Sequence, residues 1–412
     1  MKRYKHWYML LLLATLALSM QGCLGIGDNN NFTRSTRPNG SSIGINNTDQ
    51  AVFKGKIYFT LDRNLYMIDG TRTLHQLTKN MEIQDPVVSP DGKWIAFTVR
   101  NKNYSDLVYM PANGGPLHTV VTGAGNYVLN LDGANDYYWF FQPAWSADST
   151  HLIFLSDLHK AFYWYRLGGV FQSSYFLDLQ VFSLPINAPT LTGKQAVNIA
   201  KPVAYADFGD GGDRDPSYRP SHPNQVIYTH YTYDATTQTK QVIQIFLEDA
   251  TLMAKPHYPP YHPGVEGSGF DPAVPLTPGT PDLANLEPAF SPDGNFIAYV
   301  RRQDATHDGI YIMPVAEGVT DNPNNPDVQK KALAPYDKSS LILTQQYLTK
   351  PTWSPDGKQL AYITYTNNNF DIWLANLSVD PKTGAYTLKG DPVQLTDAGG
   401  HLNGDSRLFW TP

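Results

Sequence analysis

The stretch Pro351-Thr-Trp-Ser-Pro-Asp-Gly-Lys-Gln-Leu-Ala-Tyr-Ile-Thr-Tyr365 predicts a short strand, a tight turn and a second strand. Pro355 presets φ for the first corner of the turn, Asp356 can bond back to the backbone, and Gly357 takes the positive φ. The apolar run that follows, 360–363, is rich in residues that favour a buried strand. Because this hairpin recurs along the chain, it decides the fold.

The other copies begin at prolines spaced 57 to 73 residues apart, namely Pro86, Pro143, Pro216, Pro288 and then Pro351. Each is followed by an apolar strand and by further short strands. A four-stranded propeller blade takes about 40–50 residues, so each unit is interpreted as one blade plus an insertion.

The last five residues, Leu408-Phe-Trp-Thr-Pro412, match the start of a further unit, with Trp410 in the place of Trp353. The first unit, which begins near Gly55, lacks such an opening strand. We therefore expect an all-β, six-bladed propeller in which the C-terminal strand completes the first blade. A ring closed in this way leaves no free sheet edge.

These residues resemble the TolB-type propeller, whose unit is the Pro-x-Trp-Ser-Pro-Asp-Gly motif with a following Ile-Ala-Phe strand. The resemblance covers roughly residues 51–412. Two units depart from it, because Ala147-Asp-Ser149 and Arg219-Pro-Ser-His222 replace the turn. TolB itself also has an N-terminal α/β domain, for which nothing before residue 51 leaves room, so the expectation is a TolB-like propeller that lacks this domain.

The N-terminus resembles a bacterial lipoprotein signal. Basic residues precede a short apolar run, and Ser19-Met-Gln-Gly-Cys23 resembles a lipobox. The resemblance implies cleavage of residues 1–22 and lipidation of Cys23, with outer-membrane delivery in a Gram-negative cell because Leu24 stands where Asp would retain the protein. An ordinary signal peptide with a chance Cys is the alternative. Residues 23–50 are rich in Gly, Asn, Ser and Thr and predict a flexible tether to the domain at 51–412.

The bulk composition limits the classes of partner that the chain can bind. The 412 residues are 42% hydrophobic and 13% aromatic, which is ample for a core, and the formal net charge is −6. An acidic chain lacks the basic footprint of a nucleic-acid-binding protein. The apolar run at the N-terminus is too short to span a membrane, so we expect no transmembrane helix in the mature chain.

Three insertions on two adjacent blades, 122–141, 157–175 and 201–214, concentrate aromatic residues on one face of the propeller, the face that carries the loops before the inner strands. We expect this face to bind an envelope protein or a glycan, because aromatic side chains supply large rigid contact areas. The alternative is that the insertions pack on each other. The candidate contact residues are Tyr137, Tyr138, Trp139, Phe140, Phe141, Phe162, Tyr163, Trp164, Tyr165, Tyr205 and Phe208.

Three acidic residues, Asp85, Asp215 and Glu287, occupy the same repeat position just before the proline. We expect them at the mouth of the central channel, where carboxylates could attract a cation or a basic peptide. The alternative is that each caps a local turn.

An acidic Gly-rich loop at 207–215 offers Asp207, Asp210 and Asp213 as weak candidate ligands for Ca²⁺, with a solvated loop as the alternative. No other cofactor is predicted. No Gly-x-Ser-x-Gly, His-Glu-x-x-His or P-loop motif occurs, which argues against an enzyme of those classes. The predicted function is a lipid-anchored binding or scaffolding module of the cell envelope. The alternative is a metal-dependent, lyase-like carbohydrate-active enzyme, or a sugar-binding propeller, with its site at the channel mouth.

Overall fold

A computed structural model describes residues 31–37, 42–125, 137–176, 179–187, 189–204, 211–234, 236, 239–253, 272–281 and 283–412. Cys23, Tyr205, Asp207, Phe208 and Asp210 lie outside these ranges. Within the described part no helix is long and apolar enough to cross a membrane. The fold is all-β with a few short helices, as predicted.

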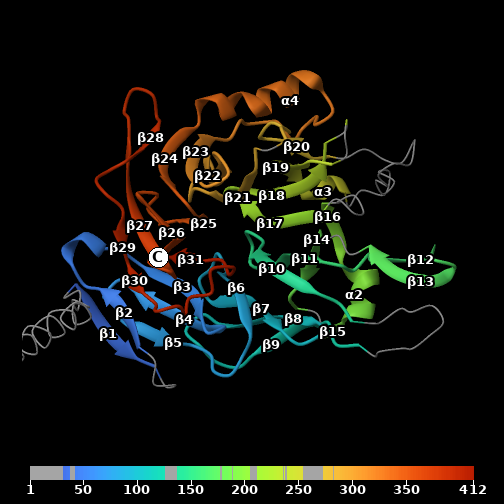
Figure 1. The fold of residues 1–412 in the computed structure, drawn as a ribbon, viewed down its shortest axis with the longest axis horizontal. Coiled ribbons are helices and arrows are strands. Elements are labelled where there is room, and N and C mark those ends of the chain that lie inside the picture. The colour runs from blue at the N-terminus through green and yellow to red at the C-terminus, as the bar shows by residue number, and fades with distance from the viewer. Residues whose placement is uncertain are drawn as a thin grey trace, which may run out of the picture.

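Antiparallel sheets surround a central axis (Figure 1). The first three sheets are β31(Phe409–Thr411)-β3(Lys56–Leu61)-β4(Asn64–Asp69)-β5(Leu74–Gln76), β6(Ile83–Val88)-β7(Trp94–Arg100)-β8(Ser105–Pro111)-β9(His118–Thr122)-β15(Leu191–Thr192) and β10(Phe140–Trp145)-β11(His151–Ser156)-β14(Gln180–Pro185)-β16(Lys201–Ala204).

Three more sheets continue the ring: β17(Gly212–Arg219)-β18(His222–Tyr233)-β19(Gln241–Asp249)-β20(Val274–Pro275), β21(Asn285–Phe290)-β22(Phe296–Arg302)-β23(Asp308–Pro314)-β24(Ser340–Gln345), and β25(Leu348–Trp353)-β26(Gln359–Thr366)-β27(Asn369–Val379), whose β27 pairs with both β28(Tyr386–Leu388) and β29(Val393–Gln394).

A further sheet, β1(Phe32–Thr36)-β2(Ser42–Asn46)-β30(Thr396–Asp397), corrects the predicted blade number. Counting each sheet of three or more strands as a blade, the described residues build a propeller of seven blades, and the prediction of six is wrong. The first six carry an inner strand at the channel, whereas the seventh lies outside them, beside the first and sixth (Figure 1).

The seventh blade also corrects the predicted tether. Residues 32–36 and 42–46 form a paired hairpin, and the side chains of Ile43 and Ile45 are buried. They pack in one core cluster with Ile57 of β3 and Ile372 of β27. Composition predicted a flexible chain here because the segment has few apolar residues, but burying two isoleucines and pairing with β30 stabilises it.

The C-terminal strand closes the ring where the repeat pattern predicted. β31 pairs with β3, with Ile57 opposite Trp410. The remaining elements lie in insertions, namely the hairpin β12(Ala161–Leu167)-β13(Val170–Phe176) and the helices η2(Asp49–Ala51), α2(Gly193–Ile199), α3(Ala250–Met253), α4(Pro326–Leu333) and η3(Ala334–Lys338).

Candidate functional site

A β-bulge at the residue before each repeat proline turns that residue's side chain toward the channel. The strand register shifts there in β6, β10, β17, β21 and β25. Proline cannot donate to the ladder, so the bulge costs no hydrogen bond at that position. The residues before the prolines all have φ between 48° and 55°, namely Asp85, Gln142, Asp215, Glu287 and Lys350. Such non-glycine residues at positive φ concentrate at sites where a side chain must be aimed.

Together with Arg407, which holds this position in β31's segment, these five residues form what we call the polar ring. Lys350 Nζ lies 2.8 Å from Glu287 Oε1 and 3.4 Å from Asp215 Oδ1. Gln142 Nε2 donates to Asp215 Oδ1 at 2.9 Å. The carboxylates therefore have partners within the protein, and these partners come from neighbouring blades.

The backbone joins the same network. The N–H groups of Asp215, Lys350 and Arg407 donate to the side chains of Gln142, Glu287 and Asp85, at 2.6, 2.7 and 3.0 Å respectively. The Arg407 Nε also lies 3.8 Å from Asp85 Oδ1. These bonds run between blades, so the acidic residues do not cap local turns. The polar ring fastens inner strands to one another.

Burial and neighbouring charge act against each other at this ring. Burial lowers the pKa of Lys350, but the carboxylates of Asp215 and Glu287 outweigh it and hold this pKa above the ordinary value. Burial raises the pKa of Asp85, opposed by the nearby cations of Arg407 and Lys350. Three acidic side chains thus face two basic ones.

The structure brings the predicted trio Asp85, Asp215 and Glu287 to one level of the channel. The sequence interpretation missed Gln142, Lys350 and Arg407, which share their repeat position. The signal was present, because each residue stands just before the repeat proline or, for Arg407, before Leu408 in its place. The prediction considered only the acidic residues at this repeat position and therefore left out the two basic ones.

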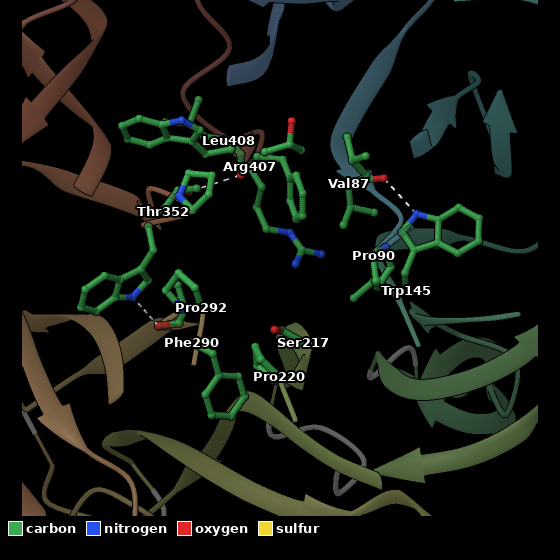
Figure 2. A pocket seen from close by; sticks show the side chains of 18 of the residues that line it. Val87, Pro90, Trp145, Ser217, Pro220, Phe290, Pro292, Thr352, Arg407 and Leu408 are labelled. Carbon is green, nitrogen blue, oxygen red and sulfur yellow. Dashed lines mark hydrogen bonds between the residues drawn. The ribbon is translucent and has the colours of Figure 1, made fainter. Parts of the chain in front are cut away.

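A cavity of about 930 Å³ extends from the polar ring to the other end of the channel. Asp215 at the ring end is buried, whereas Pro90 and Asp91 at the end with the Ser-Pro-Asp-Gly turns are exposed. The cavity therefore opens on the turn face, opposite the face that carries the loops before the inner strands. Figure 2 shows Arg407 reaching into the middle of this cavity from the ring end.

The cavity wall is mostly apolar and comes from equivalent positions of six inner strands. Prolines, small residues and aromatic edges line it, including Val87, Pro90, Trp145, Ser217, Pro220, Phe290, Pro292, Thr352 and Leu408 (Figure 2). Two repeat tryptophans fix the spacing of the blades, because Trp145 Nε1 donates to Val87 O and Trp353 Nε1 donates to Ala289 O, both at 3.0 Å. A pocket of this size and character is typical of ligand sites.

The turns that rim the open end explain why serine and aspartate recur in the repeat. Ser354 Oγ donates to Asp356 Oδ1 at 2.7 Å and accepts from the N–H of Gln359 at 2.9 Å. The same Ser–Asp bond occurs at Ser89 and Ser291, at 2.6 and 2.5 Å. Each turn is therefore rigid without help from its neighbours.

The fourth blade replaces that serine by Arg219, which is fully buried. Its Nε donates to Gly294 O of the next blade's turn at 2.7 Å, and its Nη1 donates to Gln225 Oε1 at 2.8 Å. The third nitrogen, Nη2, pairs with Glu317. The irregular turn is thus held by an arginine that also links two blades.

The aromatic candidates fall into several environments. Phe140 is fully buried in the core of β10, so it cannot contact a partner, contrary to the prediction for that residue. Tyr138 lies under Lys160, whose Nζ is 4.0 Å from the ring centroid. Tyr137 stacks on Tyr104 with centroids 6.1 Å apart.

Trp139 and Phe141 stack nearly parallel, with centroids 5.6 Å apart, and both are half-buried. Phe162, Tyr163, Trp164 and Tyr165 are in strand β12, whose hairpin with β13 projects from the edge of the disc (Figure 1). The structure places these candidates around one part of the propeller but leaves their role as contact residues a proposal.

Asp213, a weak candidate ligand for calcium, is fully buried in β17 and lies 2.8 Å from His230 Nδ1. Among the residues that the structure describes, no three His, Cys, Asp or Glu side chains form a group that could hold a metal ion.

Comparison with known proteins supports the fold. No family model matches the chain. The chain is similar to the solved structure of TolB from Acinetobacter baumannii, with a TM-score of 0.50, 15% sequence identity, and coverage of 87% of this chain and 67% of that one.

Two further solved structures are similar. For a putative TolB from Agrobacterium tumefaciens the TM-score is 0.43, with 14% identity over 87% of this chain and 98% of that one. For an oligogalacturonate lyase in complex with manganese the TM-score is 0.43, with 12% identity over 86% and 82%. The likeness to TolB from Acinetobacter baumannii supports a TolB-like propeller fold, and at 15% identity it extends to the fold alone.

Proposed function

We propose that this protein is a non-catalytic binding module of the bacterial cell envelope, and that its central channel receives an extended segment of a partner protein. The observation that carries the proposal is the cavity of about 930 Å³ that opens on the turn face. Its apolar wall suits the side chains of a peptide, and its inner end is lined by charged residues of the polar ring. Rigid turns preform the entrance, which lowers the entropic cost of binding.

The envelope location rests on the sequence before the propeller. The lipobox-like Ser19–Cys23 predicts a lipid on Cys23, and hence an anchor at the outer membrane if the cell is Gram-negative. Fractionation tests this part separately. Cys23→Ser should move the protein from the membrane to the soluble fraction, and continued membrane association of that variant would contradict the anchor.

The aromatic loop face remains a proposed second contact surface. The half-buried stack of Trp139 and Phe141 supports it, because paired aromatic side chains at a surface are typical of binding hot spots. Pull-downs from detergent-solubilised envelope should lose partners with Trp139→Ala or Trp164→Ala. Unchanged partners in both variants would count against this surface.

A crosslinker inside the cavity tests the channel. Photoreactive p-benzoyl-phenylalanine at Thr352, whose side chain lines the wall, should give a specific adduct in living cells. The same crosslinker at Val379, which is 51% exposed on the outer part of β27, is the positional control.

A second substitution makes the test decisive. Ser217→Trp adds bulk to the cavity wall two blades away and should abolish the Thr352 adduct, whereas Ser217→Ala should leave it. An adduct that survives Ser217→Trp, or one that also forms at Val379, would overturn the proposal.

A further inference from the structure

Three aromatic side chains form a small platform in the sixth blade that the channel does not use. Tyr347 precedes the inner strand β25, Tyr365 is the next-to-last residue of β26, and Phe370 is the second residue of β27. Loops before an inner strand and between the second and third strands lie on the same face of a propeller, so the three residues belong to the face opposite the cavity entrance. We call this group the tyrosine platform.

The geometry of the platform leaves two rings accessible. Phe370 is half-buried between the tyrosines, with its centroid 5.0 Å from that of Tyr365 and 5.4 Å from that of Tyr347. Tyr365 is 44% exposed and Tyr347 is 39% exposed. Both ring contacts are tilted or edge-on, so the tyrosines do not cover each other's faces.

The backbone holds the platform in place. Thr364 Oγ1 donates to Tyr347 O at 2.6 Å, which fastens the Tyr347 loop to β26. Asn367 and Asn368 form the turn between the tyrosine and the phenylalanine with φ of 52° and 64°, a conformation that asparagine tolerates well. A partner therefore meets rings whose supporting loops are already fixed.

The two loops that carry these rings are rich in neutral amides. The two loops, 344–347 and 365–370, contain no charged residue but carry Gln345, Gln346, Asn367, Asn368 and Asn369. Gln346, Asn367 and Asn368 are exposed. Gln345 Oε1 lies 2.5 Å from the same Thr364 Oγ1 and shares its single hydroxyl hydrogen with Tyr347 O. Amides can both donate and accept, which matches the hydroxyl groups of an uncharged ligand.

From this combination we infer that the tyrosine platform binds a neutral glycan. The C–H face of a sugar ring carries slight positive charge and fits the negative face of an aromatic ring. The sugar hydroxyls exchange hydrogen bonds with the amides. A protein partner with a charged rim would find no counter-charge in these two loops. This inference is independent of the channel proposal, since the two sites use different faces.

Calorimetric titration of the intact mature protein tests the inference, with the β-1,4-linked hexamers of glucose and of N-acetylglucosamine as probes. At least one should bind saturably. Tyr365→Ala and Tyr347→Ala should each weaken binding by about 5- to 10-fold, the worth of one aromatic contact. Tyr365→Phe keeps the ring and should stay within about 3-fold of the wild type.

Tyr233 provides the matched control, because it is 40% exposed but belongs to the fourth blade. Tyr233→Ala should bind the hexamer as the wild type does. Failure of both hexamers to bind the wild type at about 10 mM, or equal binding by the Tyr365→Ala and wild-type proteins, would overturn the inference.

Discussion

The two ends of the central channel use the same repeat in opposite ways. At one end, six residues from different blades bind one another, so that the charges of Lys350, Asp215 and Glu287 are satisfied inside the protein. At the other end, the regular turns are satisfied within themselves, by bonds such as that of Ser354 to Asp356, and the fourth blade, with Arg219, is the exception. The first end is therefore a structural fastening, and the second leaves an open cavity. A cluster of charged residues at a channel thus need not mark the place that a ligand enters.

Removing the central cation of the polar ring should have the largest effect. Lys350→Met keeps the apolar stem but leaves Asp215 and Glu287 without their shared counter-charge, and breaking a buried pair costs about 3–5 kcal/mol. Urea denaturation measures the free energy of unfolding. Lys358→Met, at an exposed position of the same blade, should change it by less than about 0.5 kcal/mol. An equal loss of unfolding free energy in Lys350→Met and Lys358→Met would contradict the role of the polar ring as a structural fastening.

The pH dependence of stability should be governed by a carboxyl group outside the ring. Burial raises the pKa of Asp371 to about 7, opposed by hydrogen bonds from the Ala398 N–H and Thr396. The folded protein therefore holds the proton of Asp371 more tightly than the unfolded chain does. The stabilisation of the folded state by this proton is fully present below about pH 4 and is lost as the pH rises through 7.

We expect Asp371 to lower stability by on the order of 2 kcal/mol between pH 5 and pH 7. Chemical denaturation across this range should show a flatter profile for Asp371→Asn than for the wild type. If the wild type and Asp371→Asn showed parallel stability profiles across this pH range, Asp371 would titrate near the ordinary value for aspartate. Asp371, like the carboxylates of the polar ring, would then be satisfied as an anion inside the protein.

At the turn end of the channel, a substitution should lower the free energy of unfolding by less than Lys350→Met does, because each such turn bond is local. Ser354→Ala removes the bonds to Asp356 and from the Gln359 N–H, at a cost of about 1–2 kcal/mol. Ser378→Ala, at an exposed position of β27, is the control and should be near neutral. A loss as large as that of Lys350→Met would mean that the turns also fasten the ring of blades.

Filling the cavity should have the smallest effect on stability. Ser217 faces open space, so Ser217→Trp should change the free energy of unfolding by less than about 1 kcal/mol. Ala298 in β22 is fully buried, and Ala298→Val there should cost about 1–3 kcal/mol through overpacking. A severe loss in Ser217→Trp would mean that the channel wall is packed like a core.

The repeat allowed much of the fold to be predicted, because Pro-x-Trp-Ser-Pro-Asp-Gly specifies the inner strand, the turn and the blade contact together. The hairpin at 32–46 escaped prediction since Ile43 and Ile45 become stable only by packing against distant strands. For a similar reason the cavity was not predicted, because its wall combines residues from six units that are far apart in the sequence. The three acidic residues of the polar ring were predicted from the sequence. Gln142, Lys350 and Arg407 were not, because the prediction considered only acidic residues at this repeat position.

The seam between the first and last parts of the chain has a consequence for biogenesis. β3 lacks its inner neighbour until residues 409–411 have been made, and β2 waits for β30 at 396–397. These are contacts of very high sequence separation, which slow folding. While the chain emerges, the first blade carries an unpaired edge, a known route to aggregation. We therefore expect the middle blades to form before the first blade, whose edge stays unpaired until residues 409–411 have emerged.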